Sequence, residues 1–145
     1  MEFFNIGLHM QNYGVLDASY VAAGEEKGIR KLVNDFYHEM ETQSKGQHIR
    51  SMHKDSLDVI KDKLVLFLMG WLGGPRKYAE KYGGISIPMV HKHLVINEEE
   101  RDAWLFCMQQ ALKYQDYEED FKEYLLVQLS RPANRIMQVS QASHS

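Results

Sequence analysis

The feature that most constrains this chain is residues 57–72, a segment that is apolar almost all round when drawn as a helix. The segment, LDVIKDKLVLFLMGWL, follows Asp55 and Ser56, either of which can cap a helix, and stops at the strong terminator GGP, residues 73–75. A surface helix carries one apolar stripe, but here apolar residues widen the stripe until little polar surface remains. Such a helix is buried on more than one side, so the fold must enclose it.

Helical periodicity recurs in the rest of the chain. From Glu25 to Met40, apolar residues fall on one clean helical stripe. Asn97 and Glu100 form a capping-box pattern, which predicts a helix that continues to about Gln115. Alternating strand patterns are scarce and the chain has only three prolines, so the sequence predicts an all-α fold.

The connecting segments are predicted from turn-forming and polar residues. We expect ETQSKGQH, residues 41–48, to be a polar loop, and KYAEKYGGISIP, residues 77–88, to be irregular or short-helical. A last helix begins near Glu118, and Pro132 is expected to kink it or end it. Ile136, Met137 and Val139 suggest that a helix continues after the proline. The final residues are expected to fray.

Size and composition bound the class of protein. The 145 residues suggest a single domain, and a net charge of −3 gives no sign of a nucleic-acid or membrane partner. The longest apolar run, residues 64–72, is too short to cross a bilayer. The single cysteine, Cys107, excludes an internal disulfide, and the N-terminus is a poor signal peptide. We therefore expect a cytoplasmic protein.

Two histidines, His91 and His93, stand two residues apart just before the predicted capping box. At this spacing, side chains point about 200° apart on a helix and to opposite faces on a strand, which opposes a shared metal ion. One of them can be a lone axial ligand while the other faces solvent, because a single imidazole suffices for haem iron. The sequence holds no zinc, nucleotide-binding or nucleophile motif, so no catalytic residue is assigned.

Several motifs together resemble the truncated haemoglobins of the second group. They are WLGGPRKYAEKYGG at residues 71–84, then His91, then ERDAWLFCM at residues 100–108, with the pairs Phe36-Tyr37 and Met52-His53. The resemblance runs from about residue 20 to 137. It implies a truncated two-over-two globin fold, a helical sandwich around a b-type haem.

The resemblance divides the chain into three parts. It implies a globin domain at residues 20–139, an N-terminal extension at 1–19 and a frayed tail at 140–145. The extension holds apolar residues such as Phe3, Phe4 and Ile6, so we expect it to dock on the domain or to form a dimer contact.

Carried over residue by residue, the resemblance makes His91 the iron ligand. On the opposite, distal face, the hydroxyl of Tyr37 and the indole N–H of Trp104 would donate to bound O2, and His53 would be a third pocket residue. The remaining haem contacts implied by the resemblance are Ile60 and Leu64 in the pocket, Phe67 and Leu68 on the ring, Leu94 and Ile96 beneath it, and Lys63 and Tyr78 near the propionates.

The chain departs from the family pattern at three places. Glu25 follows Gly24 where the family usually has a second glycine, and Val90 stands where a basic residue often precedes the ligand. His93 and Leu94 stand where proline and phenylalanine usually follow it. His93 is therefore the alternative iron ligand.

Three functions are compatible with these residues. The first is a haem protein that reversibly binds O2, CO and NO. The second is a haem-dependent redox enzyme or gas sensor, such as a peroxidase or a nitric oxide dioxygenase served by an electron-donating reductase. The third is a haem-free helical interaction module, which would be colourless. Monomer and homodimer both stay open.

Overall fold

The computed structural model describes residues 13–53, 55–84 and 94–144, and within these ranges it contains helices and no strand. The predicted all-α fold is therefore confirmed. The helices are α2 (Ala18–Ala22), α3 (Glu25–Thr42), α4 (Ser44–Ser51), α5 (Leu57–Trp71), α6 (Tyr78–Tyr82), α8 (Glu98–Leu112) and α9 (Glu119–His144).

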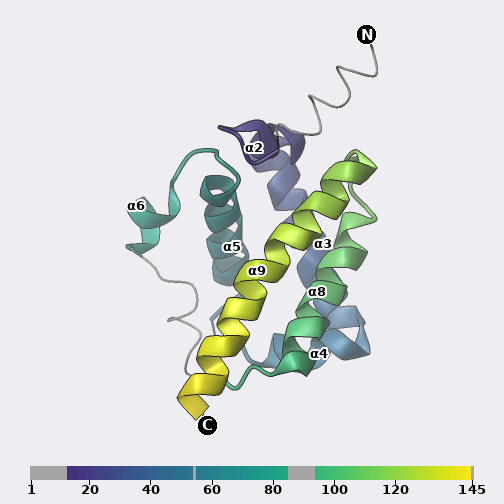
Figure 1. The fold of residues 1–145 in the computed structure, drawn as a ribbon, viewed down its shortest axis with the longest axis vertical. Coiled ribbons are helices and arrows are strands. Elements are labelled where there is room, and N and C mark those ends of the chain that lie inside the picture. The colour runs from purple at the N-terminus through teal and green to yellow at the C-terminus, as the bar shows by residue number, and fades with distance from the viewer. Residues whose placement is uncertain (1–12, 54, 85–93, 145) are drawn as a thin grey trace.

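Two pairs of helices form the body of the fold. α3 packs on α5, α8 packs on α9, and α3 also lies against α8, which joins the pairs. In Figure 1, α9 runs diagonally between α5 and α8. The core holds large apolar side chains that are almost completely buried, among them Ile29, Phe36, Leu68, Met108 and Phe121. This is the two-over-two sandwich that the motifs predict.

Two predicted helix starts are confirmed at the level of single hydrogen bonds. The backbone N–H of Val59 donates to the hydroxyl of Ser56 at 3.3 Å, so Ser56 rather than Asp55 caps α5. At the start of α8, the carboxylate of Glu100 accepts from the backbone N–H of Asn97 at 2.7 Å, and both halves of the capping box are present. These caps satisfy backbone groups that a helix N-terminus otherwise leaves unpaired.

The polar loop predicted at residues 41–48 is wrong, because most of it belongs to α4. The only buried residues of α4 are Gly46 and Ile49, too few to show a helical stripe in the sequence. A Cβ atom at Gly46 would lie 2.6 Å from the carbonyl oxygen of Met40 and 2.8 Å from Sγ of Cys107. Glycine therefore lets α4 close onto α3 and α8.

The start of α3 explains one departure from the family pattern. Gly24 and Glu25 both have left-handed backbone, with φ of 83° and 59°. Glycine adopts this conformation without cost, whereas a residue with a Cβ atom is strained by roughly 1–2 kcal/mol. The second glycine of the family would fit this turn, and Glu25 adopts it under strain.

The last helix passes through its proline. α9 continues beyond Pro132 to His144, so Pro132 does not end it, and the continuation predicted from Ile136, Met137 and Val139 is confirmed. The tail expected to fray at residues 140–145 is helical as far as His144, and Ser140 is buried with 1% of its surface exposed. Helix hydrogen bonds on both sides of the proline, together with packing against α8, outweigh the one lost donor.

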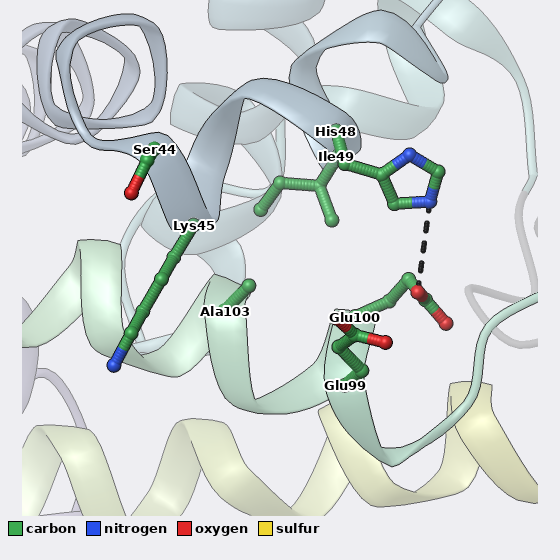
Figure 2. A pocket seen from close by; sticks show the side chains of 7 residues that line it. All are labelled: Ser44, Lys45, His48, Ile49, Glu99, Glu100 and Ala103. Carbon is green, nitrogen blue, oxygen red and sulfur yellow. Dashed lines mark ion pairs between the residues drawn. The ribbon is translucent and has the colours of Figure 1, made fainter.

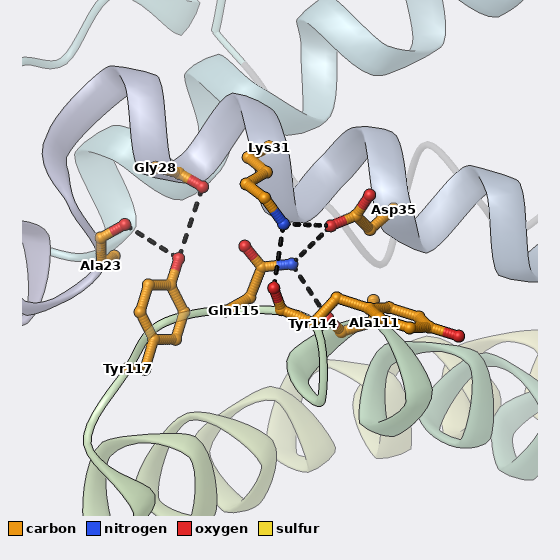
Figure 3. A network of polar contacts seen from close by, with 8 residues as sticks. All are labelled: Ala23, Gly28, Lys31, Asp35, Ala111, Tyr114, Gln115 and Tyr117. Atoms are coloured by element: carbon orange, nitrogen blue, oxygen red, sulfur yellow. Dashed lines mark hydrogen bonds and ion pairs between the residues drawn. The ribbon is translucent and has the colours of Figure 1, made fainter.

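Polar contacts tie α3 to the turn between α8 and α9, as Figure 3 shows. The amide nitrogen of Gln115 donates to Asp35 at 2.7 Å, and Nζ of Lys31 donates to the carbonyl oxygen of Tyr114 at 2.9 Å. The hydroxyl of Tyr117 donates to the carbonyl oxygen of Ala23 at 2.8 Å. These bonds fix the two helix pairs relative to each other.

The described end of the N-terminal extension docks on the domain, whereas residues 1–12 lie outside the described ranges. The Tyr13 ring lies 5.1 Å from that of Phe121, and its hydroxyl donates to Asp120 at 3.0 Å. Burial is the main cause that raises the pKa of Tyr13 to about 12. No helix in the described ranges is long and apolar enough to cross a membrane.

Candidate functional site

An aromatic cluster joins α3, α8 and the end of α4. The ring of Phe36 lies edge-on to Tyr37 at 5.1 Å and to Trp104 at 5.0 Å between centroids. Tyr37 in turn lies edge-on to His53 at 5.9 Å. The structure therefore brings together the three residues predicted for the distal face, and Phe36, which is not one of the predicted haem contacts, links two of them.

The cluster presents two hydrogen-bond donors. Tyr37 is 5% exposed, and its burial raises the pKa of the phenol, so the hydroxyl keeps its proton at every physiological pH. Within the described ranges, this hydroxyl and the indole N–H of Trp104 make no hydrogen bond. Every fully buried polar side-chain atom in those ranges does have a hydrogen-bond partner, so neither donor is fully buried. Both donors therefore face accessible space, where a polar ligand can meet them.

His53 presents a different group. Its Nδ1 lies 3.0 Å from the carbonyl oxygen of Ile49. A carbonyl only accepts, so Nδ1 carries the proton, and in the neutral ring Nε2 is then an acceptor. In neutral His53, Nε2 is therefore a hydrogen-bond acceptor and not a donor.

The predicted pocket residues of α5 lie on a face that the described helices only partly cover. α3 packs closely on one side of α5, where Ile60 and Leu68 are 8% and 1% exposed, whereas α6 packs on α5 less closely. Leu64 and Phe67 are half-buried at the edge of the core. The Phe67 ring also stacks on Trp71 at 6.1 Å between centroids. This half-covered apolar face can accept a flat apolar group.

The two residues predicted near the propionates contact the same ring. Nζ of Lys63 lies 3.3 Å from Asp55 and 5.3 Å from the centroid of Tyr82. The rings of Tyr78 and Tyr82 are 5.3 Å apart. The structure therefore brings Lys63 and Tyr78 together beside Tyr82.

A polar cluster that the sequence did not predict connects α5 to α6. The hydroxyl of Tyr82 and Nζ of Lys81 both donate to Oδ2 of Asp62, at 2.6 and 2.7 Å, and Arg30 approaches Oδ1 at 3.5 Å. The hydrogen bond from Lys81, followed by that from Tyr82, lowers the pKa of Asp62 below its usual value. Asp62 and its partners are far apart in sequence, so no local pattern indicates them.

The predicted iron ligands, His91 and His93, lie outside the described residues. The structure resumes at Leu94, whose carbonyl oxygen accepts from the hydroxyl of Ser140 at 2.6 Å. The backbone N–H of Ile96 donates to the same hydroxyl at 2.7 Å. Leu94 and Ile96, predicted for the proximal side, are therefore held against α9.

A surface hollow of about 300 Å³ lies apart from these residues, between α4 and the start of α8. In Figure 2, His48 faces Glu100 across the hollow, whereas Lys45 points away from Glu99 and Glu100. Nε2 of His48 lies 3.6 Å from the Glu100 carboxylate. None of its lining residues is a predicted haem contact. In the described ranges, no group of three or more His, Cys, Asp or Glu side chains could hold a metal ion.

Comparison with known proteins decides the family. The model of the bacterial-like globins matches residues 18–138. The chain belongs to the bacterial-like globin family. This globin is 30% identical over 126 residues to the group 2 truncated hemoglobin YjbI of Bacillus subtilis, an alignment that covers 87% of this chain and 92% of the relative.

Solved structures agree with this assignment. A cold-adapted truncated hemoglobin from the Antarctic bacterium Pseudoalteromonas haloplanktis superposes with a TM-score of 0.77 at 29% identity, over 82% of this globin and 96% of that chain. A group II 2-on-2 hemoglobin from Agrobacterium tumefaciens gives a TM-score of 0.75 at 30% identity, over 81% and 92%. The resemblance to truncated haemoglobins of the second group is confirmed.

Membership of the family implies that this globin binds haem. The described residues fit such a group: two unpaired donors on one side, a half-covered apolar face on α5, and cationic and tyrosine side chains at its edge. The side chains that would hold haem in the described ranges are therefore those of α3, α5, α6 and α8 named above.

Proposed function

We propose that this globin binds haem b through His91 and reversibly binds O2, and also CO and NO, on the distal face. Haem b would supply the ferrous iron at which diatomic gases bind. The protein would supply a pocket in which Tyr37 and Trp104 donate hydrogen bonds to the ligand. The observation that carries the proposal is the cluster of Phe36, Tyr37, His53 and Trp104, whose two donors face accessible space.

The two donors would favour a polarised ligand such as O2 over the less polar CO. A hydrogen bond to a charged or strongly polarised acceptor contributes roughly 1–3 kcal/mol. Since about 1.4 kcal/mol is a factor of ten, two such bonds together slow O2 release by roughly 30-fold to 20,000-fold. Such slow release suits scavenging or sensing better than transport.

His53 has a separate role in this proposal. Because Nδ1 donates to Ile49, the neutral ring can accept at Nε2 from a donor such as Tyr37. It would donate to the ligand only when doubly protonated. Tyr37 and Trp104 would therefore be the main ligand-stabilising donors, and His53 would orient the Tyr37 hydroxyl.

The test is an absorption spectrum of the haem-reconstituted wild type beside His91→Ala and His93→Ala. We expect a Soret band and five-coordinate ferrous haem in the wild type and in His93→Ala, and loss of the iron–histidine bond in His91→Ala. Retention of that bond in His91→Ala but not in His93→Ala would transfer the ligand to His93. A colourless wild type after reconstitution would refute haem binding altogether.

A further inference from the structure

Two polar contacts flank the segment that carries His91, and neither belongs to the pocket itself. On the C-terminal side, the hydroxyl of Ser140 donates to the carbonyl oxygen of Leu94 at 2.6 Å and accepts from the backbone N–H of Ile96 at 2.7 Å. One side chain on α9 thus satisfies a donor and an acceptor of the chain just after His91.

The Ser140 side of this contact is buried. Ser140 has 1% of its surface exposed, and the Leu94 and Ile96 residues that it contacts are half-buried. A backbone group that loses its hydrogen-bond partner in such a place costs free energy. The backbone at Leu94, three residues beyond His91, is therefore held in one place relative to α9.

On the N-terminal side, α6 is held by Asp62. None of the residues of α6 is buried, so packing alone holds this helix weakly. The Tyr82 hydroxyl and the Lys81 ammonium donate to one carboxylate oxygen of Asp62, whose side chain is 19% exposed. Lys81 is 58% exposed, so solvent screens its ion pair, and the Tyr82 hydrogen bond makes the larger contribution.

We propose that Ser140 and Asp62 are positioning residues that hold the two ends of the segment carrying His91, and thereby set how firmly the imidazole holds iron. This inference rests on the proposed haem ligation through His91. Of the two, Ser140 acts more strongly, because its side chain is buried and it makes two hydrogen bonds to residues that are close to His91 in sequence. Asp62 acts through Tyr82 on the other end.

The contact itself is tested in the apoprotein by amide hydrogen exchange at Ile96. The wild type should protect this amide, because it donates to Ser140. Ser140→Ala should exchange it at least tenfold faster, since roughly 1.4 kcal/mol corresponds to a factor of ten. The matched control is Ser143→Ala, on the same helix, whose hydroxyl donates to Val139 of α9 itself and whose loss should leave Ile96 unchanged.

The positioning role is tested in the haem-loaded protein by two readouts. One is the iron–histidine stretching band of the deoxygenated ferrous protein in resonance Raman spectra, and the other is the rate of haem transfer to an apo-globin acceptor in excess. We expect Ser140→Ala to shift or broaden the band and to speed haem loss by about tenfold. Ser140→Cys, with a weaker donor and acceptor in place, should fall between, and would serve alone should Ser140→Ala not fold.

The Asp62 end is tested by Asp62→Ala against Asp58→Ala, which removes an exposed carboxylate one turn earlier on α5. Asp62→Ala should speed haem loss several-fold and Asp58→Ala should not. An unchanged band and unchanged haem loss in Ser140→Ala and Ser140→Cys, in a wild type that shows the band, would overturn this inference alone. A wild type without an iron–histidine band would overturn the proposed function and this inference with it.

Discussion

The distal and proximal sides of the candidate site are held in place by different forces. On the distal side, Phe36, Tyr37 and Met108 lie in the core, and each is at most 5% exposed. On the proximal side, no residue of α6 is buried, and hydrogen bonds to Asp62 hold this helix. The chain after His91 is held by a hydrogen bond from Ser140. Packing spreads its stabilisation over many weak contacts, whereas each polar contact depends on one or two atoms.

This difference predicts how each side fails. Distal geometry can change only when the core is disturbed, so its variants should lose stability and function together. Proximal geometry depends on a few directional bonds, so single atoms can be removed there while the fold survives. The distal side therefore depends on the packed core, whereas the proximal side depends on a few hydrogen bonds.

The largest expected effect is on the packed core of the distal side. Phe36→Ala should lower the free energy of unfolding of the apoprotein by about 3–5 kcal/mol, because it removes a fully buried ring and leaves a cavity. Urea titration followed by circular dichroism measures this. The control is Phe67→Ala on the half-covered face of α5, which should cost less than half as much. Equal losses would contradict the comparison.

The next effect separates the two tryptophans. Trp104→Ala should speed O2 release more than tenfold, because it removes a donor worth roughly 1.4 kcal/mol or more. Trp71→Ala, which removes a side chain that is 37% exposed at the end of α5, should leave the O2 off-rate unchanged. Stopped-flow displacement of O2 by CO gives both rates. An unchanged rate in Trp104→Ala would remove this tryptophan from the mechanism.

A smaller effect depends on pH and concerns Asp62. Its pKa is lowered in the folded protein, so its charge adds stability above the unfolded pKa of about 3.9, and this stability is lost as the pH falls through the lower folded value. Asp62→Asn should therefore be less stable than the wild type near pH 7, by roughly 1 kcal/mol. The difference in free energy of unfolding between the two proteins should disappear in acid. A gap that persists at the lowest pH at which both proteins fold would show that the charge is irrelevant.

The smallest effect concerns the outer member of the same cluster. Arg30 lies 3.5 Å from Asp62 and its side chain is 44% exposed, so Arg30→Gln should cost at most about 1 kcal/mol. Urea titration at low and high salt measures this cost, which should shrink as salt is added. A larger loss would mean that Arg30, rather than Tyr82, anchors the cluster.

Local rules in the sequence predict much of the fold. Two helix starts are determined by caps that act within three residues, at Ser56 for α5 and at Asn97 and Glu100 for α8. The apolar stripe between Glu25 and Met40 predicts α3. The α4 helix was not predicted, because most of its side chains are polar and show no apolar stripe. It is held by close tertiary packing at Gly46.

The candidate site also contains residues that were predicted and residues that only the folded chain reveals. Tyr37, His53 and Trp104 were predicted by resemblance to a family, and the structure brings them together. Ser140 and Asp62 were not predicted, because their partners lie 44 and 46 residues away in one case and 19 and 20 in the other. A serine in an apparent tail and an aspartate in a charged helix turn look like solvated residues until the chain is folded.

The lone cysteine has a practical consequence. Cys107 is fully buried beside Gly46, and burial raises the pKa of its thiol to about 11. Thiol-directed reagents are electrophiles that the thiolate attacks, and the Cys107 thiolate is scarce and enclosed at neutral pH. A second cysteine engineered on the surface would therefore take a maleimide dye or spin label alone, in an otherwise unaltered chain. Distances between such a probe and the haem edge could then be followed without first preparing a cysteine-free background.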